Sequence, residues 1–120
     1  MLHEYVDNGF HGKTEIILKS GEVIPLKQIQ PGMVTMNNNT ILATIVMKIK
    51  NVQLVELMDE NKKTGIVCSY NKIPMNMEQI DFIKHPKQEY IMYHVITNTT
   101  KIDIGKFTFN DYNCLMESLL

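Results

Sequence analysis

The sequence predicts a single all-β domain, and three observations lead to this prediction. The chain has 120 residues, the usual size of one domain. Apolar residues recur in short runs of about four to eight residues, separated by turn-forming residues. Alanine occurs once, at Ala43, while isoleucine, valine and threonine are frequent, a composition that weakens helices and favours strands. Many short strands in one small domain must close or double back to protect their edges.

Nine segments have the apolar content and the turn boundaries of short strands. In chain order they are 14–19, 22–26, 33–36, 40–50, 52–58, 64–70, 89–97, 101–104 and 106–109. The first two are joined by a hairpin turn at Ser20 and Gly21. Residues 26–32 predict a short helical turn, which ends there because Pro31 disfavours the helical backbone at the residue before it.

The remaining segments are predicted as connections. Residues 37–39 form an exposed loop tip, and residues 59–63 form a charged turn. Residues 71–87 show no clear pattern and contain two prolines, so they predict a long connection. The tail, residues 111–120, can form a short C-terminal helix with Asp111 as its N-cap.

Composition excludes several classes of function. With 12 lysines against 13 acidic residues the net charge is −1, which argues against a nucleic-acid partner bound by bulk charge. No apolar run approaches the roughly 18 residues of a membrane span, and the first residues carry acids rather than the cations of a signal peptide. Two cysteines without a C-x-x-C pair predict neither a disulfide framework nor zinc. A reducing, cytoplasmic compartment is therefore expected.

Four histidines are present, but they predict no metal site. None is paired at the spacing of metal ligands on a helix, and none lies next to a cysteine. His94 alternates with Tyr90, Met92 and Ile96 along one predicted strand, which favours a packed, hydrogen-bonded histidine.

The dipeptide Asn113-Cys114 is the most unusual feature for chemistry. The side-chain amide of an asparagine can attack its own backbone carbonyl, which forms a succinimide and cuts the chain. A cysteine directly after it can accept an acyl group, because its thiolate is a good nucleophile. Without further context, the same pair also fits a helix cap followed by a helical residue.

The surrounding sequence resembles the Hint (hedgehog/intein) superfamily from residue 9 to residue 113. Residues 9–22 (GFHGKTEIILKSGE) are similar to its opening block, and residues 24–34 (IPLKQIQPGMV) are similar to the segment that follows. Residues 67–73 (VCSYNKI) look like the middle block. Residues 93–96 (YHVI) and 107–113 (FTFNDYN) look like the closing block in its phage or large-virus form.

The resemblance implies a flattened all-β horseshoe and self-processing by protein splicing. It divides the chain into an upstream flank at 1–8, an intein-like domain at 9–113 and a downstream flank at 114–120. The scissile junctions are then Asn8–Gly9 and Asn113–Cys114. Splicing proceeds by successive acyl transfers and asparagine cyclisation within one chain, so no cofactor is implied. The partners are the flanking exteins in cis, and a monomer is expected.

The sequence departs from the family pattern at positions that carry chemistry. Gly9 stands where the first nucleophile, cysteine or serine, belongs, and Lys72 stands where the middle-block histidine belongs. Ser69 replaces a threonine conservatively, Tyr112 fills a penultimate position that is often histidine, and Met33 replaces an aspartate. These departures predict a non-splicing form, either silenced by substitution or naturally degenerate.

One reaction remains available to the sequence as it stands. Cyclisation of Asn113 needs no thioester, and His94, Asp111 and Tyr112 are candidates to assist it. His11 and His85 are weaker candidates for proton transfer.

Two alternatives stay open. The first is a catalytically inactive Hint-derived β-module that acts as a structural or binding domain, which Gly9 and Lys72 favour. The second is a cysteine hydrolase that uses Cys68 or Cys114 with His85 or His94. Exposed loops such as 37–39 and 59–63 would tolerate a split of the chain.

Overall fold

The computed structural model describes residues 7–112, and this part of the chain is built of β-strands, which confirms the all-β prediction. The ten strands are β1 (Phe10–His11), β2 (Glu15–Ile17), β3 (Val23–Pro25), β4 (Ile41–Val52), β5 (Leu54–Asp59), β6 (Lys62–Ser69), β7 (Phe82–Lys84), β8 (Gln88–Thr97), β9 (Lys101–Ile104) and β10 (Phe107–Asn110). A single turn of 3-10 helix, η2 (Leu26–Gln28), follows β3, within the predicted helical turn.

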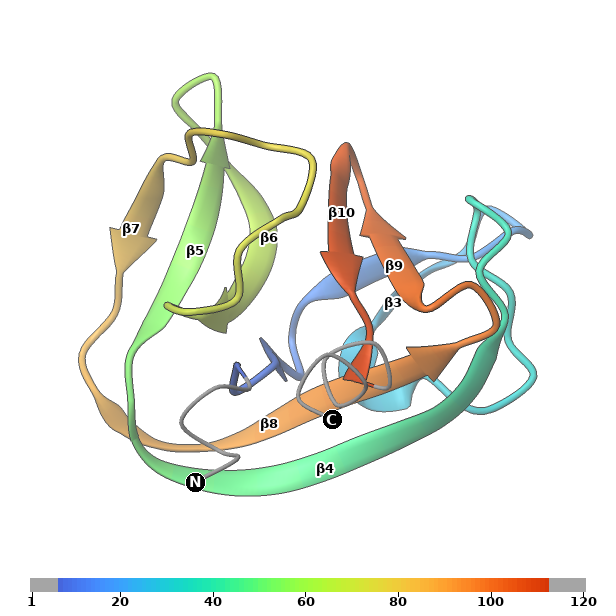
Figure 1. Cartoon of the computed structure of the whole chain (residues 1–120), viewed down its shortest axis with the longest axis horizontal. Helices are drawn as coiled ribbons and strands as arrows, with labels where there is room; N and C mark the ends of the chain where they lie inside the picture. Colours follow the sequence, from blue (N-terminus) through green and yellow to red (C-terminus); the bar gives the residue numbers. More distant parts are fainter. Residues whose placement is uncertain (1–6, 113–120) are drawn as a thin grey trace.

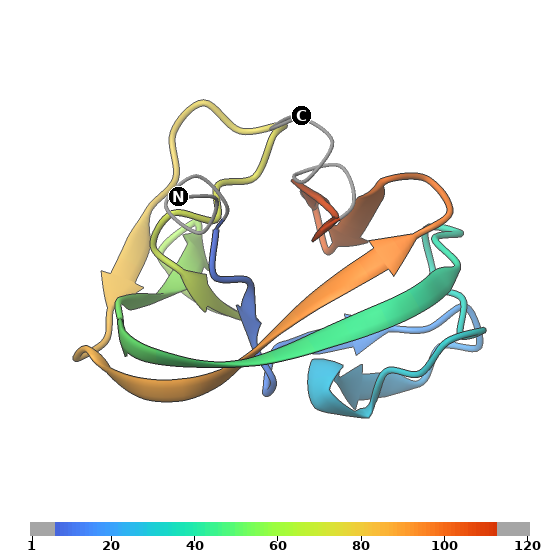
Figure 2. The same cartoon turned by 60° about the horizontal axis from the view of Figure 1, so that its bottom comes forward.

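The strands form one large sheet and two hairpins (Figure 1). The large sheet has six strands in the order β4-β8-β1-β6-β5-β7, with antiparallel pairing throughout. The hairpins are β2–β3 and β9–β10. Turned by 60°, the fold shows β4 and β8 as a long curved ribbon that runs across the molecule, with the β2–β3 hairpin below its right-hand part (Figure 2).

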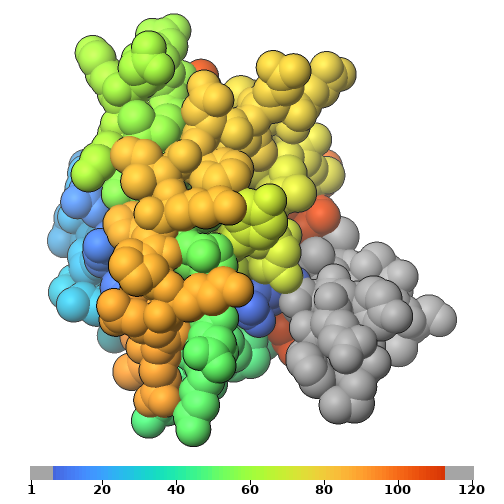
Figure 3. Space-filling view, turned by 90° about the vertical axis from the view of Figure 1, so that its left-hand side faces the viewer, coloured from blue at the N-terminus to red at the C-terminus, as the bar shows by residue number. Residues whose placement is uncertain are grey.

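The β4–β8 ribbon follows from the alternation in its sequence. Ile45 pairs with His94 and Met47 pairs with Met92, so that the buried side chains of β8 face the interior. Val46 and Ile91 lie on the other face and are more than half exposed. Figure 3 views the side of the molecule that carries β7 and this ribbon.

The shortest strand, β1, lies at the centre of the large sheet. Phe10 pairs with Cys68 on one side and with Tyr93 on the other. Its ring packs edge-on against Phe109 of β10, with 5.0 Å between the ring centroids. Phe10 thus joins the sheet to the β9–β10 hairpin through the main hydrophobic core.

Thr14 extends the connection between β1 and β6. Its hydroxyl donates to the carbonyl of Val67 at 2.8 Å and accepts from the Val67 amide at 3.0 Å. Thr14 is fully buried, so these bonds satisfy backbone groups that have no access to water.

The structure corrects three sequence predictions. Residues 33–36 are not a strand, because only Val34 and Thr35 make isolated bridges. Residues 71–87 are not an uninterrupted connection, because β7 lies within them and pairs with β5. The strand β1 was not predicted, since two residues are too few for a periodic pattern.

Several predictions are not tested by the fold. Asn113 and Cys114 lie outside the described residues, as does nearly all of the predicted C-terminal helix. The horseshoe shape remains a prediction. Within residues 7–112, no helix is long and apolar enough to cross a membrane.

Candidate functional site

Six of the sequence-predicted site residues meet in one cluster. It is made by the segment before β1, the ends of β6 and β10, the loop after β6, and β8. We call this group the junction cluster and define it as Asp7, Gly9, Ser69, Lys72, His94, Asp111 and Tyr112. Asp7, Ser69, Lys72, His94 and Asp111 are each at most 8% exposed. Polar side chains buried to this degree normally need hydrogen-bond partners within the protein.

Lys72 makes the central contacts of the junction cluster. Its Nζ lies 3.2 Å from Oδ2 and 3.3 Å from Oδ1 of Asp7, and the two side chains are 3% and 7% exposed. The same Nζ donates to the backbone carbonyl of Asn110 at 3.4 Å. It also lies over the ring of Phe10, 4.8 Å from the centroid. One ammonium group therefore connects the segment before Gly9 with the end of β10.

Gly9 has a backbone conformation that favours glycine. Its φ is +81°, and a Cβ built there would lie 2.4 Å from the carbonyl oxygen of Tyr93 and 3.2 Å from Cε1 of His94. Its amide donates to Oδ1 of Asp7 at 2.7 Å, and its carbonyl accepts from the Ser69 amide at 2.9 Å. The position of the expected nucleophile is thus closed to a side chain by the backbone of β8.

Ser69 binds the backbone on both sides of the Asn8–Gly9 peptide, at the Asn8 amide and at the Gly9 carbonyl. In addition to the bond from its amide to Gly9, its hydroxyl oxygen accepts the amide of Asn8 at 3.1 Å. The hydroxyl itself donates to Oδ1 of Asn71 at 2.7 Å. Ser69 therefore positions the Asn8–Gly9 junction through backbone contacts.

His94 lies between the two ends of the described chain. It is 1% exposed, and its Nδ1 is 4.0 Å from Oδ1 of Asp7. Its ring packs on Tyr112, with 4.8 Å between centroids. Within residues 7–112 neither imidazole nitrogen reaches a partner at hydrogen-bond distance and angle, so His94 is packed as predicted, with a backbone contact to Asp7 that raises its pKa in place of the predicted hydrogen bond. Burial lowers the pKa of His94 to about 4, with Asp7 opposing this effect.

Asp111 fixes the end of β10 against β8. Its Oδ2 accepts the amide of Thr97 at 2.9 Å, and its own amide donates to the carbonyl of Thr100 at 3.0 Å. The carboxylate is thus used to anchor the backbone two residues before Asn113.

The remaining candidates lie elsewhere or lack reactivity. The imidazole of His11 contacts the Lys13 amide and the Tyr90 ring, and His85 faces Glu56 at 3.8 Å. Cys68 is fully buried, and burial raises the pKa of its thiol to about 12. A protonated thiol without solvent access is not a hydrolase nucleophile.

Sequence reasoning missed Asp7 and Asn110 as members of this region. Asp7 lies in the segment assigned to the upstream flank, and Asn110 contributes a backbone carbonyl. A pairing between Asp7 and Lys72, 65 residues apart, has no local signal in the sequence.

No protein-family model and no curated protein matches the chain.

Replacement of Gly9 by alanine should destabilise the fold more than the same change at Gly21. Both residues have positive φ, but nothing lies within 4 Å of a Cβ built at Gly21. We expect a loss of about 1 kcal/mol for Gly21→Ala from backbone strain alone, and about 2–4 kcal/mol for Gly9→Ala from strain plus overlap. Urea unfolding of the two variants measures the difference. Equal losses would contradict steric closure at Gly9.

Removal of the Lys72 ammonium should be costly because it leaves a buried carboxylate unpaired. We expect Lys72→Met to lower the free energy of unfolding by about 3–5 kcal/mol. The double variant Asp7→Asn with Lys72→Met should recover much of this loss, since the amide oxygen can still accept from Gly9. Lys48→Met, which breaks the exposed Lys48–Glu89 pair, is the control and should cost at most about 1 kcal/mol. A double variant no more stable than Lys72→Met would refute this account.

His94 should make stability fall as the pH drops below 6.5. The unfolded chain takes up a proton on this histidine near its ordinary pKa of 6.5, whereas the folded chain does so only near 4. Stability is therefore lost between these pH values, by roughly 3 kcal/mol in total. Urea unfolding across this range measures the slope. His94→Gln should flatten it, while His11→Gln, whose pKa is also lowered by burial, should flatten it less. An unchanged slope in His94→Gln would exclude His94 as the source.

Proposed function

We propose that the chain is an intein-like, self-processing domain of Hint type that has lost the N-terminal splicing step and retains cleavage at Asn113–Cys114. The observation that carries this proposal is the position of Lys72 Nζ. It binds the carboxylate of Asp7, two residues before Gly9, and the carbonyl of Asn110, three residues before Asn113. A self-splicing domain needs both junctions at one place, and these contacts bring the approaches to both junctions together.

The first acyl shift is absent from this form. Gly9 has no nucleophilic atom, and the carbonyl of Tyr93 occupies the space that a side chain would need. Lys72 stands where the family has a histidine. Its ammonium group donates hydrogen bonds but cannot accept one, so it cannot take up a proton as a neutral histidine can. Both departures act at the same junction.

The proposed cleavage at Asn113–Cys114 uses only atoms of the chain itself. The side-chain amide nitrogen of Asn113 attacks its own backbone carbonyl carbon, and the peptide bond to Cys114 breaks. The amide nitrogen loses a proton and the leaving nitrogen of Cys114 gains one, so no external reactant is consumed. The products are residues 1–113 ending in a succinimide and residues 114–120 with a free amine.

His94 is the group best placed to carry that proton. Burial lowers its pKa to about 4, so the imidazole is neutral and weakly basic at pH 7; it can still relay a proton by accepting at one nitrogen while it donates from the other. Its ring packs on Tyr112, the residue directly before Asn113. Asp111 acts as a positioning residue through its bond to the Thr97 amide.

Intact mass of the purified chain under reducing conditions tests the proposal. We expect residues 114–120 to be released over hours to days, with two fragment masses that initially sum to that of the uncut chain. Asn113→Ala should stay whole, while Asn61→Ala, at an exposed turn, should cleave normally. His94→Gln should slow release by about 100-fold, and His85→Gln should not. Release that persists in Asn113→Ala would refute cyclisation.

A second candidate function is a catalytically inactive Hint-derived module that only binds or supports other chains. The closed position of Gly9 favours it, because that site is built around glycine rather than around a missing side chain. A chain that stays whole throughout the mass experiment would support this function over self-processing.

A further inference from the structure

The buried ion pair between Lys72 and Asp7 has the geometry of two reactants. Nζ of Lys72 lies 3.2 Å and 3.3 Å from the two carboxylate oxygens of Asp7. Nearly equal distances to both oxygens place the carboxyl carbon within about 3.6 Å of Nζ, close to the separation of about 3–3.5 Å from which a bond can form. The fold thus holds an amine and a carboxyl group, 65 residues apart in the sequence, in position to react.

The surroundings of the pair favour an uncharged product. The two side chains are 3% and 7% exposed, and Nζ lies 4.8 Å and 5.8 Å from the ring centroids of the buried residues Phe10 and Phe109. In water an amine and a carboxylic acid stay ionised because water solvates both charges, and burial removes this solvation. An amide carries no charge, so burial shifts the balance from the ion pair toward an amide.

The backbone bonds of the pair fit an amide as well as they fit two charges. Oδ1 of Asp7 accepts the Gly9 amide at 2.7 Å, which polarises the carboxyl group and holds the oxygen that an amide retains. Nζ of Lys72 donates to the Asn110 carbonyl at 3.4 Å, and an amide N–H there can do the same. Among residues 7–112, the hydrogen bonds to Oδ2 come from Nζ alone, so Oδ2 is the oxygen that can leave.

We propose that Lys72 and Asp7 form an isopeptide bond, which ties the segment before β1 to the loop after β6. One proton passes from the ammonium group to Oδ2, the amine nitrogen attacks the carboxyl carbon, and the bond between that carbon and Oδ2 breaks. Oδ2 receives a second proton from the same nitrogen and leaves as water, and one N–H remains on the amide. His94, whose Nδ1 lies 4.0 Å from Oδ1, is placed to relay the second proton.

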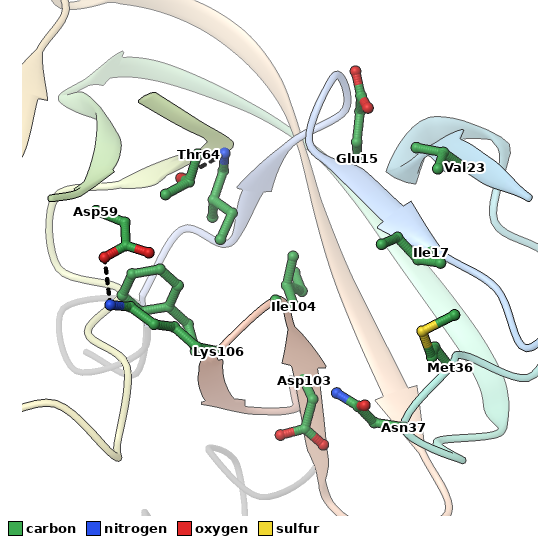
Figure 4. A pocket seen from close by; sticks show the side chains of 13 residues that line it. Glu15, Ile17, Val23, Met36, Asn37, Asp59, Thr64, Asp103, Ile104 and Lys106 are labelled. Carbon is green, nitrogen blue, oxygen red and sulfur yellow. Dashed lines mark hydrogen bonds and ion pairs between the residues drawn. The ribbon is translucent and has the colours of Figure 1, made fainter. Parts of the chain in front are cut away.

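A second lysine–aspartate pair lacks these surroundings and serves as a control. Lys106 binds Asp59 at the edge of the pocket between the β2–β3, β5–β6 and β9–β10 hairpins (Figure 4). The side chains of this pair are 49% and 37% exposed. Water solvates both charges there, so we expect this pair to stay ionic.

Intact mass of the folded chain, followed over days at neutral pH, tests this proposal. We expect the mass to fall below that of the sequence by one water molecule, about 18 Da. Digestion with trypsin, which cuts after lysine, should then give a branched peptide that joins residues 1–13 to residues 64–84 and is uncut after Lys72. Asn113→Ala, which cannot form a succinimide at that position, should lose water equally, so the result does not depend on the proposed cleavage.

Variants of the two ion pairs assign the reaction. Lys72→Met should keep its full mass, because it has no nitrogen to react, whereas Lys106→Met should lose water as the unchanged chain does. In Asp7→Asn the leaving group becomes ammonia, so a cross-linked product is lighter by about 17 Da instead. The unchanged chain kept in urea should keep its full mass, because the pair is not formed there.

Four results would overturn the proposal. The first two are a folded chain whose mass stays that of its sequence, and a loss of water that persists in Lys72→Met. The third is a branched peptide that contains Lys106 in place of Lys72. The fourth is a loss of water without any branched peptide, because an aspartate that forms a succinimide with its own backbone loses water as well.

Discussion

The buried ion pair between Lys72 and Asp7 is the interaction on which the arrangement of the junction cluster depends. Removing two charges from water costs several kcal/mol per ion, and the cost is recovered only when both charges are fully hydrogen-bonded. Here the carboxylate binds the ammonium group and also the amide of Gly9, while the ammonium group also binds the Asn110 carbonyl. Each charge therefore holds a different part of the backbone. The pair defines how the first described segment meets the end of β10.

Once this pair is in place, the path of the chain from Asp7 to Phe10 is determined. Gly9 turns through a positive φ and passes so close to β8 that a side chain cannot be accommodated. Ser69 binds the Asn8 amide and the Gly9 carbonyl, and Phe10 then enters the core against Phe109. The glycine at residue 9 and the lysine at residue 72 are thus parts of one packing arrangement. For the proposed Hint-type domain, this favours natural adaptation over silencing at a single position.

The sequence predicted the elements that are defined by local patterns. The runs of apolar residues over 40–50 and 89–97 predicted the strands β4 and β8, and Ser20 and Gly21 predicted the β2–β3 hairpin, but the pairing of β4 with β8 was not predicted. The same reasoning could not find β1 or β7, since two or three residues carry no period and are held by strands far away in the chain. A lysine in a loop is normally exposed, so nothing local indicated that Lys72 is buried. His94 was correctly placed on the inner face, but its unpartnered nitrogens depend on the packing of Asp7 and Tyr112, which no strand pattern specifies.

The division of roles within the junction cluster follows from what each side chain can do with a proton. The Lys72 ammonium and the Asp7 carboxylate hold backbone groups, and any change in their charge would leave the other buried without a partner. His94 is different, because burial keeps it neutral and its nitrogens are not used to hold the fold. A neutral imidazole can accept a proton at one nitrogen and donate from the other. In the proposed cleavage, Lys72 and Asp7 therefore hold the backbone in place, while His94 carries the proton.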